Sequence, residues 1–169
     1  GGSGAAPISP ELLKWFHAIG APVLEGYGMT ESNAICSSCT GAAYEEKPGA
    51  AGTLSPLVDF KTCDEEGRDL PPGEKGEIWL RSVCKIQSYW HRPEATASQF
   101  KDGWMATGDI GFIDEDGFVH LADRAKDLII RGGENIYPAE IETLLSRHPA
   151  VLESAVIGLP DERMGESVA

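Results

Sequence analysis

The sequence predicts an α/β protein built of several parts, and three observations carry that prediction. Residues 1–44 combine a helix, a short strand and a glycine-containing turn, which is typical of an α/β layer. Residues 45–124 hold short strand candidates between turn clusters, which favours a small antiparallel β-barrel. Residues 125–169 begin a β–α–β pattern too short to close its own core, so we expect the start of a truncated α+β domain.

The first part opens with a helix signal. Ser9 is a typical N-cap, Pro10 suits the first helical position, and Gly20 can end the helix in the left-handed conformation. Four residues at helical spacing predict one apolar face: Leu12, Trp15, Phe16 and Ile19. The apolar pair 23–24 then predicts a short strand, and residues 26–28 predict a glycine-broken turn after it.

Turn clusters divide the middle part, at residues 47–49, 64–67, 70–73 and 114–117. Four strand candidates lie between them, at 58–63, 77–83, 111–114 and 118–122. Ile78 and Leu80 share one face of their strand and Glu77 and Arg81 the other, so we expect that strand to be half buried. The pair 116–117, Asp-Gly, predicts a hairpin.

The last part predicts a strand at 127–131 that ends at two glycines, a helix, and a second strand at 151–157. Pro138 suits the first helical position and Pro149 ends the helix. Its predicted apolar face consists of Ile141, Leu144, Leu145 and His148.

Charge and hydropathy exclude several classes of function. With 14 Lys and Arg against 27 Asp and Glu, the net charge is −13. A general binder of nucleic-acid backbones needs a basic face, so we expect no nucleic-acid partner. A local nucleotide site remains compatible with this charge. No apolar run is long enough to cross a bilayer. No charged region followed by an apolar region stands at residue 1, so we expect no signal peptide.

The cysteines, at positions 36, 39, 63 and 84, are too few for a disulfide scaffold. A reducing, cytoplasmic compartment is the simpler interpretation. Cys36 and Cys39 form a C-x-x-C pair, but no second pair or histidine stands at zinc-ligand spacing. We expect ordinary buried or half-buried thiols, with metal or redox use as the alternative.

The first cluster of candidate site residues is GYGMTES at 26–32. Its glycines allow close approach of a ligand, and Tyr27 can stack on a planar base. Thr30 offers a hydroxyl to a phosphate oxygen, and Glu31 offers a hard oxygen suited to Mg²⁺. The alternative is a plain strand-to-helix turn with a capping threonine.

Two further clusters follow. In GWMATGD at 103–109, the final carboxylate can accept hydrogen bonds from a ribose diol, although Thr-Gly-Asp is also a common turn. Basic residues gather in DRAKD at 123–127 and RGGENIYP at 131–138, where they oppose the negative field of the chain. A solvated linker is the alternative. Glycines before a helix can cradle a phosphate, but this spacing matches neither common phosphate-loop motif.

The order and spacing of these segments closely resemble the adenylate-forming superfamily. That superfamily includes acyl- and aryl-CoA synthetases, firefly luciferase and the adenylation domains of nonribosomal peptide synthetases. Within it, the chain looks like an internal fragment of a fatty- or medium-chain acyl-CoA synthetase-like member. The matching segments are 3–7 (SGAAP), 26–31 (GYGMTE), 49–52 (GAAG), 76–78 (GEI), 89–96 (YWHRPEAT), 107–109 (TGD), 124–127 (RAKD), 151–158 (VLESAVIG) and 160–161 (PD).

The resemblance implies an AMP-forming ligase. Such an enzyme joins a carboxylic acid to AMP from ATP, releases pyrophosphate, and passes the acyl group to the thiol of coenzyme A. In the implied nucleotide site, adenine packs against Gly4, Ala5, Ala6, Pro7 and Tyr27. Thr30 donates to a phosphate and Glu31 binds Mg²⁺. Asp109 and Arg124 hold the ribose. The resemblance also implies that Gly26, Gly28 and Met29 border the acyl pocket and that Lys126 is the hinge. Gly132 and Gly133 are implied to lie on the side where the thiol enters.

The resemblance also implies domains. Residues 1–44 are expected to end a large α/β N-terminal domain, 45–124 to form a β-barrel subdomain, and 125–169 to hold a hinge and a truncated α+β C-terminal domain. The family's phosphate loop is expected before Gly1 and its catalytic lysine after Ala169, so we expect no adenylation by this chain alone. The alternatives are an adenylation domain that loads a carrier-protein thiol, and a non-catalytic module that binds nucleotide or self-associates.

Overall fold

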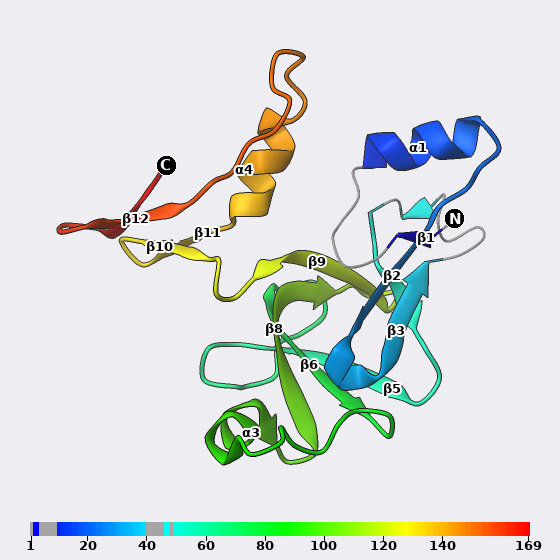
Figure 1. Ribbon diagram of the computed structural model, residues 1–169, viewed down its shortest axis with the longest axis vertical. Coiled ribbons are helices and arrows are strands. Elements are labelled where there is room, and N and C mark those ends of the chain that lie inside the picture. Colours follow the sequence, from blue (N-terminus) through cyan, green and yellow to red (C-terminus); the bar gives the residue numbers. More distant parts are fainter. Residues whose placement is uncertain (1, 4–9, 40–45, 48) are drawn as a thin grey trace. The chain divides into compact units, whose positions relative to one another are not determined.

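The described chain is mostly antiparallel β-structure with a few short helices (Figure 1). The computed structural model describes residues 2–3, 10–39, 46–47 and 49–169. The helical elements are α1 (Pro10–Ala18), η1 (Thr30–Ser32), α3 (Pro93–Gln99) and α4 (Pro138–Leu145). The strands are β1 (Gly2–Ser3), β2 (Leu24–Met29), β3 (Ala34–Cys39), β4 (Gly52–Leu54), β5 (Val58–Cys63), β6 (Gly76–Ser82), β7 (Phe100–Lys101), β8 (Trp104–Ile113), β9 (Phe118–Arg124), β10 (Ile129–Arg131), β11 (Glu134–Ile136), β12 (Gly158–Asp161) and β13 (Gly165–Val168).

The strands form two sheets. The larger has the order β1-β2-β3-β4-β9-β8-β6-β5, with β7 paired to β8, and the smaller has the order β11-β10-β13-β12. β1 pairs with β2 in parallel, whereas β2–β3 and β5–β6, each side by side in Figure 1, are antiparallel. In the described residues the larger sheet is an open path from β1 to β5. The barrel expected for 45–124 therefore stays a prediction.

The chain divides into two compact units. Unit 1 contains residues 1–107 and 111–121, and unit 2 contains residues 108–110 and 122–169. The domain boundaries expected after residues 44 and 124 stay predictions. In the part of the chain that the structure describes, no helix is long and apolar enough to span a membrane.

The main core of unit 1 is built mostly from strand residues. Its buried members are Tyr27, Cys36, Ala51, Phe60, Ile78, Leu80, Met105 and Val119. Ile78 and Leu80 are fully buried, while Arg81 faces outward and pairs with Asp59 across the strands, with 2.8 Å between Nη2 and Oδ2. The alternation predicted for this strand is thus confirmed.

Helix α1 begins at Pro10 as predicted, and Gly20 follows it with φ +75°. The buried contact of α1 is made by Leu13, which packs with Cys39. The predicted apolar face does not supply this contact, because the position of β3 decides which side of the helix is covered. The exposed fractions of Leu12, Trp15 and Ile19 are 44%, 55% and 56%.

The turn predicted at residues 26–28 is wrong, because strand β2 runs through both glycines to Met29. Strand β3 pairs along this stretch, with a register shift between Tyr27 and Gly28. A Cβ on Gly26 would lie 3.1 Å from the carbonyl oxygen of Ser37. Glycine here permits close approach of a neighbouring strand and not a chain reversal.

The strand predictions for the middle part are largely confirmed. β5 covers 58–63 as predicted, β6 is displaced by one residue, and β9 extends the predicted strand to Arg124. The segment predicted at 111–114 is the end of the longer strand β8. Residues 107–109 therefore lie inside a strand, and their interpretation as a common turn is wrong. Gly117 has φ +81° in the predicted hairpin turn between β8 and β9.

Residues 125–169 differ most from the secondary structure predicted for them. β10 begins at Ile129, and after Gly132 and Gly133 the chain pairs back as β11, a strand that the sequence pattern did not predict. The strand predicted at 151–157 is wrong: this segment leads into a β12–β13 hairpin that begins at Gly158. Helix α4 ends at Leu145, before Pro149, and its predicted apolar face is largely uncovered, with Leu144 65% exposed.

Candidate functional site

A short turn places Thr30 and Glu31 directly after strand β2. The Ser32 hydroxyl donates to the Met29 carbonyl at 2.8 Å and accepts from the Met29 amide at 3.2 Å. Asn33 closes the turn with φ +62°. The N-cap is therefore Met29, whose backbone is held by the Ser32 side chain, so the alternative in which Thr30 is the cap is wrong. Thr30 is exposed.

Glu31 is held by the segment that follows strand β6. The Tyr89 hydroxyl donates to Glu31 Oε1 at 3.0 Å, and the amide of Ile86 donates to the Glu31 carbonyl at 2.7 Å. Burial and the hydrogen bond to Glu31 raise the pKa of the Tyr89 phenol. The phenol is consequently a hydrogen-bond donor at neutral pH.

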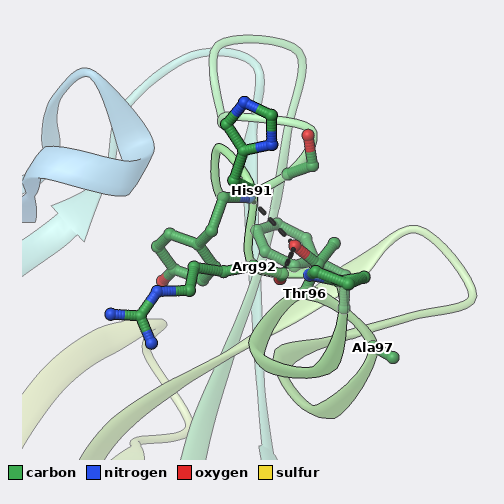
Figure 2. Close-up of a pocket in the computed structure, with 8 residues that line it drawn as sticks. His91, Arg92, Thr96 and Ala97 are labelled. Carbon is green, nitrogen blue, oxygen red and sulfur yellow. Dashed lines mark hydrogen bonds between the residues drawn. The ribbon is translucent and has the colours of Figure 1, made fainter.

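A surface pocket of about 480 Å³ adjoins Tyr89 (Figure 2). The Thr96 hydroxyl accepts from the Tyr89 amide at 3.0 Å and donates to the Arg92 carbonyl at 2.8 Å. Figure 2 shows these two bonds at Thr96, with the His91 ring and the Arg92 side chain pointing away from it in different directions. The pocket lining thus fixes the backbone that presents Tyr89.

The other predicted residues of GYGMTES lie along β2. Tyr27 is 7% exposed and packs edge-on against Phe60, with ring centroids 5.8 Å apart. Met29 is partly buried against the core, while Gly28 is exposed and Gly26 half-buried. Stacking of Tyr27 on a base and bordering of an acyl pocket by the other three remain predictions.

In unit 2 the structure brings together the two residues predicted to hold a ribose. Arg124 Nε lies 3.5 Å from Asp109 Oδ1. The Asp109 side chain is 17% exposed and that of Arg124 is 60% exposed. The amide of Ala125 donates to the Gly108 carbonyl at 2.8 Å, which holds the end of β9 against β8. A carboxylate beside a guanidinium in this setting can accept hydrogen bonds from a diol while its charge is balanced.

The predicted hinge residue, Lys126, is exposed, and its Nζ lies 3.9 Å from Asp127 Oδ1. Nearby, the Asp123 carboxylate accepts from the Ala139 amide at the start of α4, at 3.0 Å. Gly132 and Gly133 have φ +61° and +88° in the β10–β11 turn. A hinge role for Lys126 and a thiol-side role for the glycines remain predictions.

Two further predictions about the nucleotide site are not tested by the structure. Gly4, Ala5, Ala6 and Pro7 lie outside the described residues. Thr30 and Glu31 belong to unit 1 and Asp109 and Arg124 to unit 2, so their convergence on one nucleotide stays a prediction.

The cysteines of the chain are free thiols. Cys36, Cys39 and Cys63 are buried as expected, whereas Cys84 is exposed. Burial raises the pKa of each of the three buried thiols.

Glu31 offers a carboxylate oxygen of the kind that Mg²⁺ takes when it is shared with nucleotide phosphates, and its metal role stays a prediction. Among the described residues, no three side chains of His, Cys, Asp or Glu group as a complete metal site. Protein-bound Mg²⁺ commonly takes one or two carboxylates together with substrate phosphates and waters. Glu31 Oε1 is occupied by Tyr89, and in the described chain Oε2 carries no hydrogen bond. One hard oxygen is therefore available.

Comparison with known proteins decides the family. The AMP-binding enzyme pattern matches residues 1–90, and the pattern of the AMP-binding enzyme C-terminal domain matches residues 140–169. The chain belongs to the AMP-binding enzyme family. The resemblance to the adenylate-forming superfamily is thereby confirmed, and its curated relatives include AMP-forming acyl-CoA ligases.

Two curated relatives of this AMP-binding enzyme chain are similarly close. Feruloyl-CoA synthase of an Amycolatopsis species is 45% identical over 163 residues, which span 96% of this chain and 33% of that protein. Fatty acid–[acyl-carrier-protein] ligase ScoC of Streptomyces coeruleorubidus is 45% identical over 171 residues, spanning 98% and 33%. The chain thus covers about a third of the length of these relatives.

Solved structures share the fold. o-Succinylbenzoate CoA synthetase (MenE) of Bacillus subtilis, in complex with the acyl-adenylate intermediate OSB-AMP, matches with a TM-score of 0.92 at 38% identity. The match covers 99% of this AMP-binding enzyme chain and 34% of that one. Another structure of the same enzyme holds ATP and a magnesium ion.

The sequence did not predict that Tyr89 lies beside Glu31. It falls in the family-like segment 89–96, but nothing in the local pattern links it to Glu31. The two residues lie 58 positions apart in the chain, and a hydrogen bond at that separation leaves no periodic signal.

Proposed function

We propose that this chain carries nucleotide-binding and hinge segments of an AMP-forming carboxylic acid–CoA ligase. Such a ligase converts a carboxylate and ATP into an acyl-adenylate and pyrophosphate, and then forms an acyl-CoA and AMP. Family membership supports the reaction class, and the Asp109–Arg124 pair supports the nucleotide role most directly. The acid is left open, because most of an acyl pocket would come from outside this chain.

The proposed roles follow the chemistry of each side chain. Thr30 donates to the α-phosphate and Glu31 presents a carboxylate oxygen to Mg²⁺, while Asp109 accepts from the ribose hydroxyls beside Arg124. Bound Mg²⁺ would neutralise charge on the phosphates as the carboxylate attacks. Tyr27 with residues 4–7 contacts adenine, and Gly26, Gly28 and Met29 border the acyl group.

The domains keep the expected roles in this proposal. Residues 1–44 end an α/β N-terminal domain, 45–124 form a barrel subdomain, and 125–169 hold the hinge and the start of an α+β C-terminal domain. Rotation about Lys126 would bring Gly132 and Gly133 toward an incoming thiol, since a few residues must absorb such a change. The free cysteines suit the cytoplasmic location expected from the sequence.

The nucleotide role is tested by calorimetric titration of the chain with AMP and with ATP·Mg²⁺. Asp109→Ala removes an ionised acceptor, so we expect its AMP affinity to fall about tenfold or more. Asp59→Ala is the matched control, because Asp59 pairs with Arg81 at 2.8 Å in the other unit and has no proposed ligand. Equal AMP affinity for Asp109→Ala and the unchanged chain would overturn the assignment.

The chain by itself is proposed to be inactive in adenylation. The family's phosphate loop and C-terminal lysine are expected outside it, and each lost transition-state donor costs about 3–4 kcal/mol. We expect no isotope exchange between pyrophosphate and ATP above background. Exchange by the purified 169-residue chain would contradict this expectation.

The similarity to an acyl-carrier-protein ligase favours a second candidate, in which the acyl acceptor is a carrier-protein thiol. Transfer of a labelled acyl group to CoA or to a phosphopantetheine-bearing carrier by the longer protein distinguishes the two acceptors. A non-catalytic, self-associating module is the third candidate, which the uncovered apolar residues of α1 support. Dimers on a sizing column without AMP binding would favour it.

A further inference from the structure

The main-chain carbonyl and the side-chain carboxylate of Glu31 are both held by residues 86–89, a segment that is distant in the sequence. The Ile86 amide holds the Glu31 carbonyl at 2.7 Å, and the Tyr89 hydroxyl holds its carboxylate at 3.0 Å. The main-chain bond alone would fix the backbone and leave the carboxylate to rotate among its rotamers. The Tyr89 bond therefore adds one specific restraint, on the direction of the carboxylate.

Tyr89 is itself restrained on two sides. Its amide donates to Thr96 Oγ1 at 3.0 Å, as Figure 2 shows, and its ring packs edge-on against Phe100 with centroids 5.9 Å apart. The Thr96 hydroxyl is also fixed, since it donates to the Arg92 carbonyl at 2.8 Å. Backbone, ring and hydroxyl of Tyr89 are thus set before any ligand arrives.

We infer that Tyr89 is a positioning residue that holds Oε1 of Glu31 so that Oε2 faces a metal–nucleotide ligand. The inference rests on the proposed function in one respect, namely that Glu31 contacts the metal. Because Oε1 accepts the phenol hydrogen bond, Oε2 is the oxygen that Glu31 would present to the cation. Groups that orient a metal-binding carboxylate commonly change metal affinity by about 10- to 100-fold when they are removed.

The first test needs no ligand. Side-chain order of Glu31 is measured by ¹³C relaxation in the chain labelled at glutamate methylene groups, for the unchanged protein and for Tyr89→Phe. We expect the Glu31 side chain to become more mobile in Tyr89→Phe. Tyr137→Phe is the control, because it removes a phenolic hydroxyl in the other unit, and it should leave Glu31 unchanged. Equal order of Glu31 in Tyr89→Phe and the unchanged chain overturns the inference.

A second variant keeps the test decisive if Tyr89→Phe fails to fold, as judged from its amide spectrum. Thr96→Val removes the acceptor for the Tyr89 amide and leaves the phenol in place. We expect it to loosen Glu31 as well, to a smaller extent. Unchanged order of Glu31 in a folded Thr96→Val chain would then count against the inference.

A third test measures the binding of Mn²⁺·ATP to the chain. Binding is monitored as a decrease in the resonance signal of free Mn²⁺. Glu31→Gln should weaken the binding of this complex, and Tyr89→Phe should weaken it about tenfold or more. Weaker binding in Glu31→Gln with unchanged binding in Tyr89→Phe overturns the positioning inference alone. Unchanged binding in Glu31→Gln instead removes the metal role of Glu31 from the proposed function, and the order of Glu31 in the first test then decides the inference.

Discussion

Asp114 is the centre of a polar cluster at the β8–β9 turn. Its Oδ2 accepts from Lys47 Nζ at 2.5 Å and lies 3.0 Å from His120 Nε2, and its Oδ1 accepts from the amides of Asp116 and Phe118 at 3.0 and 2.9 Å. Burial by itself raises the pKa of Asp114, but the bonds from Lys47, His120 and the Phe118 amide outweigh it and hold the pKa well below its ordinary value. The carboxylate is thus stabilised in its ionised form.

Two substitutions separate the contributions to this cluster. Asp114→Ala removes the acceptor for all four groups, whereas Asp114→Asn keeps an oxygen for the two amides and loses the charge. Hydrogen bonds to charged groups contribute about 1.5–3 kcal/mol each, and partial exposure reduces this. With the Asp114 side chain 20% exposed, we expect Asp114→Ala to lower the free energy of unfolding by about 2–4 kcal/mol and Asp114→Asn by about 1–2 kcal/mol.

Urea unfolding followed by tryptophan fluorescence measures this loss, and its pH dependence has a definite sign. A carboxyl group whose pKa is lowered by folding contributes stability that is complete above its unfolded pKa of about 4. The contribution is lost as the pH falls through the folded-state pKa. The difference between the unchanged chain and Asp114→Asn should therefore be full at pH 7 and shrink below about pH 4. Equal free energies of unfolding at pH 7, or a gap that widens in acid, would refute the reasoning.

Two further predictions concern packing and thiol reactivity. Gly52 has φ +88° and a Cβ there would lie 1.9 Å from the Ser38 carbonyl carbon, so Gly52→Ala should destabilise the chain far more than Gly73→Ala. Gly73 has φ +86° with open space around its Cβ position, and its substitution should cost only the left-handed strain of about 1–2 kcal/mol in urea unfolding. Cys84, the exposed cysteine, should react rapidly with a disulfide reagent while the three buried thiols react only after denaturation. Rapid reaction of more than one thiol in the folded chain would contradict the burial.

Local chemistry was sufficient to predict many elements of this chain. The helix start at Pro10, the left-handed Gly20 after the helix and the bounds of β5 follow from capping residues and period-two alternation, which act over a few residues. The resemblance implied that Asp109 and Arg124 reach the same ribose. The structure places Arg124 Nε 3.5 Å from Asp109 Oδ1, and the ribose role of both residues stays a prediction.

The sequence alone thus predicted the strands β5, β6 and β9 of the middle part, whereas the residues named for a nucleotide site stay predictions. Only the tertiary structure decided that β2 continues through Gly26 and Gly28, because β3 supplies the partner that keeps the glycines extended. Tertiary structure also decided that Tyr89 meets Glu31 and that residues 158–168 form a hairpin. Such contacts join residues whose separation along the chain carries no local pattern, and they form only when distant segments pack together.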